Sequence, residues 1–384
     1  MVITDGKIFT MANGTIEHGY IRIEGTIIAE VGDMSSYVPV EGEEVLGAAG
    51  AGIYPGFIDA HSHLGMWEDS MGFEGDDGNE DTDPATPQLR SIDAINPTDK
   101  AFAEALAGGV TTVVIAPGSS NPIAGRVCAL KTKGCCIDDM LIKDNLAMKL
   151  ALGENPKLTY HAKGLSPATR MATAALIREQ LAKARRYMED REAAAEDDEL
   201  DEPEFDFKCE AMLPLLRKEM KAHIHAHRAD DICTAMRICN EFDIDYVLIH
   251  CTDGYTLAAK IAQSGAAAIV GPLINARTKP ELSGQRLSNS AQLVAAGVKT
   301  AICTDHPELP TQYLTLSAGI AVRGGLNYDE ALRAITINPA EICGIADRVG
   351  SIEVGKDADL VFFFGDPLSV YATPKLVIIN GEVK

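Results

Sequence analysis

Short apolar runs separated by turns dominate the first part of this chain. Over residues 1 to 52 these runs alternate with polar positions, and the pairs Asn13-Gly14 and Glu24-Gly25 lie between them as turns. Alternation of this kind is typical of half-buried strands joined by tight connections. The pattern therefore predicts a β-rich segment without helices of the barrel type. Its strands are expected at Ile3–Phe9, Tyr20–Ile23 and Ile27–Val31.

The end of the chain has the same character as its beginning. Residues 350–364 contain two glycines, which read as turns, before the apolar run Leu-Val-Phe-Phe-Phe, and Val377–Val383 is a further apolar run broken by Asn-Gly. Two end segments of like character suggest a single unit built from both termini. We expect residues 1–52 and 350–384 to form one small, discontinuous β-sandwich domain.

The middle of the chain alternates apolar β-branched runs with longer helical patterns. Asp99–Leu106 reads as a helix that ends at Gly108-Gly109, and Val110–Ala116 follows as a strand. Strands that alternate with helices predict a parallel barrel or a doubly wound sheet, and 384 residues are enough for one large barrel plus a small domain. Further strands are expected at Val127–Lys131, Met148–Leu152, Lys221–His227, Tyr246–His250, Ala267–Val270 and Lys299–Cys303, and helices at Thr169–Glu189, Asp230–Phe242, Thr256–Gln263 and Asn289–Ala296.

Ile53–Gly65 is the stretch that carries candidate chemistry. Pro55-Gly56 forms a turn, Phe57-Ile58 begins a short buried strand, and His61 and His63 end it. Residues two apart in a strand point to the same side, so both imidazoles face one way. Neutral imidazole is a common ligand of zinc and related metals.

Other residues of ligand type lie at the ends of later predicted strands. His223, His225 and His227 share one face of a strand, and three inward imidazoles would each need a partner if they only packed. His250 ends the next strand, and Asp305 follows the last one. In a barrel of parallel strands such ends meet on one face, where active sites lie.

These residues resemble the amidohydrolase superfamily of metal-dependent hydrolases. Pro55–His63, which reads Pro-Gly-Phe-Ile-Asp-Ala-His-Ser-His, is similar to that family's first-strand signature, and residues 336–361 are similar to its C-terminal tail. Gly271-Pro272-Leu273 and residues 304–307 are similar to the imidazolonepropionase-like and prolidase-like branch. The resemblance implies a (β/α)8 TIM barrel over residues 53–349, flanked by the small domain.

The resemblance also implies a ligand set. His225 matches the fifth-strand ligand, whereas His223 lies deeper, where a core role is equally open, and His227 lies further out, near substrate. A bridge between two metals would come from Glu154 or from a carboxylated Lys149, and Glu154 is preferred because it needs no modification. His161 is expected near the substrate, and Asp305 and His250 are the expected catalytic groups. The implied metal ligands are His61, His63, Glu154, His225, His250 and Asp305, holding one or two divalent ions, with zinc expected and iron, manganese or nickel as alternatives.

Net charge and cysteine content limit the expected partners and the expected cellular compartment. A formal charge of −22 argues against nucleic acid or an anionic membrane as partner. No run of eighteen apolar residues and no signal peptide is evident, and nine scattered cysteines without a Cys-x-x-Cys pair indicate free thiols in a reducing cytosol. We therefore expect a cytoplasmic homo-oligomer that acts on a small molecule. The acidic run Glu189–Glu204 reads as a solvated helix end and loop.

The expected activity is hydrolysis of a carbon–nitrogen bond in a cyclic amide, an amidine or a deaminase-type substrate, other than an ordinary protein peptide bond. A dipeptidase or N-acyl amino-acid hydrolase is the alternative, and it would need cations aimed at a free carboxylate. A non-catalytic barrel scaffold is disfavoured because His61, His63, His225, His250 and Asp305 are all present. The candidate cations are Arg90, Arg126, Arg170 and Arg277.

Overall fold

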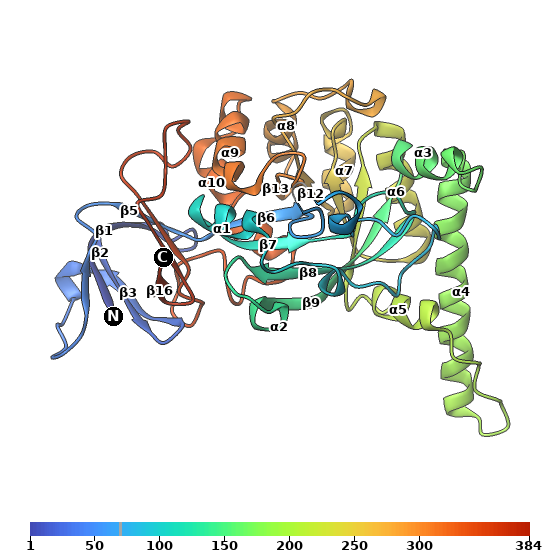
Figure 1. Cartoon of the computed structure of the whole chain (residues 1–384), viewed down its shortest axis with the longest axis horizontal. Helices are drawn as coiled ribbons and strands as arrows, with labels where there is room; N and C mark the ends of the chain where they lie inside the picture. The colour runs from blue at the N-terminus through green and yellow to red at the C-terminus, as the bar shows by residue number, and fades with distance from the viewer. Residues whose placement is uncertain (69–70) are drawn as a thin grey trace.

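The computed structural model describes residues 1–68 and 71–384, and it contains two eight-stranded sheets (Figure 1). One sheet runs in chain order from β6 to β13, and each strand pairs with the next. Backbone hydrogen bonds also join its two ends, since the N–H of Asp305 donates to the carbonyl of His61 at 3.1 Å. The expected barrel is confirmed. Its strands are β6 (Phe57–Ser62), β7 (Val110–Ile115), β8 (Ile123–Lys131), β9 (Leu141–Ala151), β10 (Lys221–Ala226), β11 (Tyr246–His250), β12 (Ala267–Val270) and β13 (Thr300–Ile302).

The third strand of the barrel runs against the others. β8 is antiparallel to both β7 and β9, whereas the remaining neighbours in the barrel are parallel. Antiparallel neighbours need no helical crossover, and the chain passes from β7 to β8 through residues 116–122 alone. This short connection lies at the barrel end where the parallel strands finish. It thereby brings Ser119 to the face where a barrel carries its active site.

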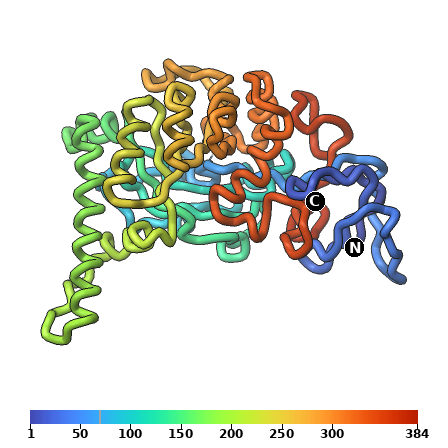
Figure 2. Tube along the Cα trace, turned by 180° about the vertical axis from the view of Figure 1, so that it is seen from behind, coloured from blue at the N-terminus to red at the C-terminus, as the bar shows by residue number. Residues whose placement is uncertain are grey.

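Helices cover the outside of the barrel, and several begin with a side-chain cap. The Asp99 carboxylate accepts the N–H of Ala101, and the Thr169 hydroxyl accepts that of Ala172, so each satisfies a donor that the first helical turn leaves free. Figures 1 and 2 show α7, α8 and α9 side by side along one side of the barrel. The helices are α1 (Lys100–Ala107), α2 (Ile137–Met140), α3 (Glu154–Ala162), α4 (Arg170–Glu196), α5 (Phe207–Leu216), α6 (Ala229–Phe242), α7 (Ala258–Ser264), α8 (Asn289–Ala295), α9 (Leu314–Arg323), α10 (Tyr328–Arg333) and α11 (Ile337–Ile342).

The acidic run occupies the far end of α4 and the loop that follows. α4 continues to Glu196, seven residues past the predicted helix end at Glu189, and its last turns extend beyond the rest of the molecule (Figures 1 and 2). Most of residues 191–204 are exposed. Among the described helices, none is long and apolar enough to cross a membrane.

Both ends of the chain contribute strands to the second sheet. Its hydrogen-bonded order is β16-β15-β14-β5-β1-β2-β3, with β4 beside β1, so the strands form one continuous sheet. Ile3, Ile21, Ile53 and Leu360 belong to an apolar core of its own. The sheet extends past residue 52, because β5 pairs with β14 as far as Pro55. Its strands are β1 (Val2–Phe9), β2 (Thr15–Glu24), β3 (Ile27–Asp33), β4 (Val45–Gly47), β5 (Gly52–Pro55), β14 (Leu360–Phe363), β15 (Leu376–Ile379) and β16 (Glu382–Val383).

A buried ion cluster joins this sheet to the barrel. Lys131, at the end of β8, is 1% exposed, and its ammonium contacts the carboxylates of Asp357, at 2.7 Å, and Asp359. Arg348 also binds Asp357, at 2.8 Å from the same carboxylate oxygen that Lys131 contacts. The aspartates of the tail motif therefore have a structural role, since they hold the start of β14 against the barrel.

Candidate metal centre

Two groups of ligand-type side chains lie at the strand ends on one face of the barrel. The first group is His61, His63 and Asp305, and the second group is His225, His227 and His250. Within each group the donor atoms lie within 4.8 Å of one another. All five histidines are buried, and Asp305 is largely buried. The barrel thus brings residues from β6, β10, β11 and the segment after β13 together, as their positions in the sequence predict.

In the first group, a hydrogen bond from the ring of His63 orients that ring toward Asp305. Nδ1 of His63 lies 2.7 Å from the carbonyl of Ala116, which can only accept, so this nitrogen carries the proton and Nε2 keeps its lone pair. That Nε2 lies 3.2 Å from Oδ1 of Asp305, and Nε2 of His61 lies 3.5 Å from the same oxygen. Both rings and the carboxylate therefore converge on one point.

The second group is held in the same way. Nδ1 of His250 donates to the carbonyl of Gly271 at 2.7 Å, while Nδ1 of His225 and of His227 lie 3.0 and 2.7 Å from the hydroxyls of Ser119 and Thr252. The three ring centroids are 4.6 Å apart pairwise. Hydrogen bonds to Nδ1 that leave Nε2 free are typical of histidines that bind a metal.

Burial keeps four of these histidines neutral. It lowers the pKa of His250 to about 4, and it lowers the pKa of His61, His225 and His227 well below the ordinary value. Burial alone would raise the pKa of Asp305, but His250, His63 and Lys149 outweigh it and hold the pKa of this carboxyl below its usual range. At neutral pH these four imidazoles are therefore neutral and Asp305 is ionised, the protonation states in which such groups bind metals.

Lys149 lies beside the first group. It stands on β9 opposite His223, has no exposed surface, and its Nζ is 3.1 Å from Nε2 of His61. Burial lowers the pKa of Lys149 to about 8, although the charge of Asp305 opposes the shift. A lysine with so low a pKa is partly neutral at neutral pH, which gives its amine nucleophilic character.

Glu154 and His161 lie outside both groups. Glu154 begins α3, and its Oε2 accepts the backbone N–H of Glu281 at 3.3 Å. Neither group of converging donors in the described chain includes it. His161 is exposed in the last turn of α3 and does not line the described cavity. His223 lies two residues before His225 in β10 and is fully buried. Neither of its ring nitrogens has a hydrogen-bond partner among the described residues.

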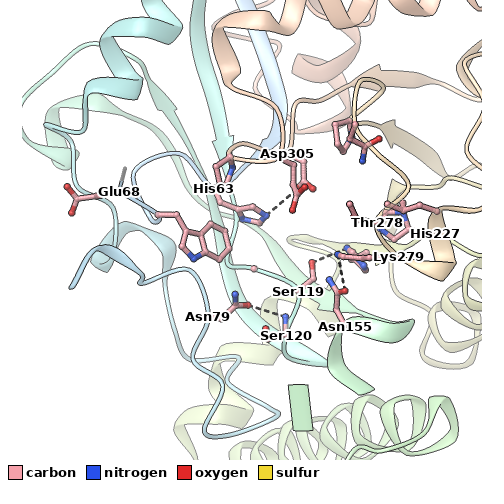
Figure 3. Close-up of a pocket in the computed structure, with 18 residues that line it drawn as sticks. His63, Glu68, Asn79, Ser119, Ser120, Asn155, His227, Thr278, Lys279 and Asp305 are labelled. Atoms are coloured by element: carbon pink, nitrogen blue, oxygen red, sulfur yellow. Dashed lines mark hydrogen bonds and ion pairs between the residues drawn. The ribbon is translucent and has the colours of Figure 1, made fainter. Parts of the chain in front are cut away.

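A cavity of about 450 Å³ opens over the two groups (Figure 3). Trp67 stands edge-on to His63, with ring centroids 4.8 Å apart. Lys279 lies across the cavity from His63, where it donates to Oδ1 of Asn155 at 3.1 Å. Lys279 is the cationic member of this lining, and Arg90, Arg126, Arg170 and Arg277 do not belong to it. The lining residues are His63, Trp67, Glu68, Asn79, Gly118, Ser119, Ser120, Asn155, His225, His227, Pro272, Asn275, Thr278, Lys279, Leu282, Asp305, Pro307 and Glu308.

Comparison with known proteins agrees with this architecture. The Amidohydrolase family model matches residues 53–384. Amidohydrolase tasK from Hapsidospora irregularis is 30% identical over 95% of this chain, which spans only 40% of that longer protein. An imidazolonepropionase from Maricaulis maris is 27% identical over 94% of this chain and 92% of its own length. The crystal structure of an amidohydrolase from Thermotoga maritima MSB8 is 38% identical, with a TM-score of 0.95 over 100% of this chain and 98% of that one. With its barrel and these matches, this chain belongs to the amidohydrolase family of hydrolases.

Proposed function

We propose that this protein hydrolyses a carbon–nitrogen bond in a small molecule with the help of two divalent cations, one at each group of donors. The observation that carries this proposal is the pair of converging donor groups beneath a single cavity. The names of the imidazolonepropionase and adenine deaminase relatives, which refer to chemistry at carbon–nitrogen bonds, support the reaction class.

The residues present fit such cations. Nε2 of His225 and Oδ1 of Asp305 are buried without a hydrogen-bond partner in the described structure, which is costly unless another group satisfies them. Imidazole nitrogens and a carboxylate are the usual ligands of zinc, and they also suit iron, manganese and nickel. When bound, such a cation lowers the pKa of a coordinated water to about 7 and polarises a carbonyl. We propose zinc as the metal.

Two cations in neighbouring sites repel each other, so an anion between them is needed. The position of Lys149 favours it over Glu154 for this role. Addition of carbon dioxide to its neutral amine gives a carbamate and releases one proton, which converts the side chain from a potential cation into an anion. Glu154 is anionic without modification, but its carboxylate is engaged by the backbone of Glu281. We therefore propose Lys149, and not Glu154 as the sequence suggested, as the source of the bridging anion.

Asp305 and the second histidine group have distinct proposed roles. Asp305 is ionised and lies within 3.2 Å of His63 Nε2, where its carboxylate can take a proton from the attacking water and return it to the leaving nitrogen. His250 stacks on His227, with an angle of 10° between the ring planes. Because His227 also lines the cavity, its ring can pack against the substrate while its Nε2 serves the cation.

One observation favours the alternative substrate class. Lys279 lies in the cavity wall on the side of His227, where an ammonium can bind a free carboxylate of a dipeptide or an N-acyl amino acid (Figure 3). Lys279→Met would then raise KM for N-acyl amino acids and leave KM for uncharged lactams and amidines unchanged. An equal effect on charged and uncharged substrates would remove the support for this alternative.

A substrate screen tests the proposed reaction. Metal-loaded protein is assayed against hydantoins, lactams, amidines and N-acyl amino acids, with release of ammonia or a new amine as the readout. The proposal predicts turnover in at least one class, loss of turnover on chelation, and recovery when metal is returned. Turnover that survives complete removal of metal would contradict it.

A further inference from the structure

Glu281 is a buried carboxylate beside the second histidine group that the ligand pattern of the sequence does not include. It lies in the short turn η5 (Pro280–Leu282), after β12, and is 1% exposed. Its Oε1 lies 3.7 Å from Nε2 of His225 and 3.7 Å from Nε2 of His227. That oxygen has no hydrogen-bond partner in the described part of the chain, and 3.7 Å is too long for a hydrogen bond to either ring.

The other oxygen of Glu281 is fixed in place. Its Oε2 accepts the backbone N–H of Glu154 at 3.0 Å, while the N–H of Glu281 donates back to the Glu154 carboxylate. Gly153 makes this approach possible, because a Cβ there would come within 2.7 Å of Oε2 and its φ is +94°. One oxygen is thus anchored to the start of α3, and the other points at two imidazoles.

These separations suit donors that share a cation. A tetrahedral ion with ligand bonds of roughly 2.0–2.2 Å holds neighbouring donor atoms about 3.4 Å apart. We propose that Glu281 is a carboxylate ligand of the cation bound by His225, His227 and His250. The set then has three neutral nitrogens and one anionic oxygen, a donor combination that zinc favours. This inference rests on the proposed function, since it extends the ligand set of the same centre.

The set also predicts an order of metal binding. The second group with Glu281 offers four protein donors, whereas the first group offers His61, His63 and Asp305. A site that supplies more donors, already oriented by hydrogen bonds, binds its ion more tightly. The second group should therefore fill first as metal is added to the metal-free protein.

Glu281→Gln tests this assignment, because it keeps the shape of the side chain and removes its charge. Zinc affinity and stoichiometry are measured by titration of the metal-free protein, and the visible absorption of the cobalt-substituted protein reports the geometry of the ligands. Glu308→Gln is the matched control, since it makes the same change in an exposed carboxylate of the cavity wall. We expect Glu281→Gln to weaken the tighter zinc site by at least about tenfold and to change the cobalt spectrum, and Glu308→Gln to do neither.

The remaining outcomes are also decisive. Unchanged zinc affinity and an unchanged cobalt spectrum in a folded Glu281→Gln variant would overturn the assignment while leaving the proposed function intact. If Glu281→Gln does not fold, Glu281→Asp serves instead, and full retention of the tight site in that shortened side chain would equally overturn it. A wild-type protein that binds no metal would contradict the proposed function itself.

Discussion

The amine of Lys149 lies 3.1 Å from Nε2 of His61, and Lys149 has no exposed surface. A buried, protonated lysine beside a histidine that binds a metal ion would be repelled by that ion, unless the lysine loses its charge. This contact is the reason to expect a modified lysine in the centre. It favours Lys149 over Glu154 as the source of the bridging anion.

Lys149→Ala should lower the metal content of the purified protein, because the anion between the two cations is lost. Bicarbonate together with a short-chain carboxylic acid should restore part of the metal and the activity by supplying a carboxylate in the vacated space. Glu154→Gln should retain its metal, because its amide oxygen can still accept the N–H of Glu281. Metal analysis of both variants checks this, and loss of metal in Glu154→Gln with retention in Lys149→Ala would reverse the assignment.

Asp305→Asn should separate proton transfer from metal binding. The amide keeps the shape of the side chain and can still offer an oxygen, but it cannot accept a proton. Turnover should fall by about 10²–10⁴-fold, the usual contribution of a general acid or base, while most of the metal is retained. The measurement is kcat at saturating substrate alongside metal content, and near-normal kcat would exclude Asp305 as the proton carrier.

The metal-free protein should lose stability between pH 6.5 and about 4. Histidines are protonated in the unfolded chain below about pH 6.5, but burial keeps them neutral in the folded state, so acid favours unfolding by up to ~1.4 kcal/mol per pH unit for each proton. Burial raises the pKa of Asp59 and of Glu281 to about 7, and these two carboxyls act in the opposite sense. The histidines with lowered pKa are His61, His223, His225, His227 and His250, which outnumber them.

Denaturant titrations with a chelator present, at steps across that range, give the free energy of unfolding. A decrease toward pH 4 is the expected result. A free energy that stays constant or rises on acidification would show that these rings are not held neutral by the fold.

Lys131→Met should destabilise the protein by about 3–5 kcal/mol, because it leaves the buried carboxylate of Asp359 without its cation, whereas Asp357 keeps its pair with Arg348. Lys133→Met is the matched control, since Lys133 pairs with Glu382 at the exposed edge of β16, where such a pair contributes about 0–1 kcal/mol. Denaturant unfolding of both variants gives the comparison. Equal effects of the two substitutions would contradict a structural role for the buried cluster.

Periodicity made part of the centre predictable. His61 and His63 share a strand face, and His225, His227, His250 and Asp305 follow buried runs, so their convergence follows once the runs are taken as barrel strands. Lys149 also lies within an apolar run, Met148–Leu152, which is predicted to be a strand. Glu154 is absent from both groups of converging donors, because it begins α3 and its carboxylate accepts the backbone N–H of Glu281.

The remaining contacts depend on how distant segments meet. Glu281 and Lys279 lie in a polar stretch after β12 without strand or helix periodicity, so only the folded path of that stretch brings them to the histidines. The antiparallel direction of β8 could not be predicted from the sequence either, because an apolar run has the same pattern in either direction. Ser119 reaches His225 only as a result of that reversal.

Metal analysis of the purified, zinc-loaded wild-type protein tests the central claim most directly. Two donor groups that share one cavity predict about two zinc ions per chain, together with loss of turnover when chelation removes them and its return when zinc is added back. A folded protein that takes up no zinc, or any other divalent metal, would contradict the account.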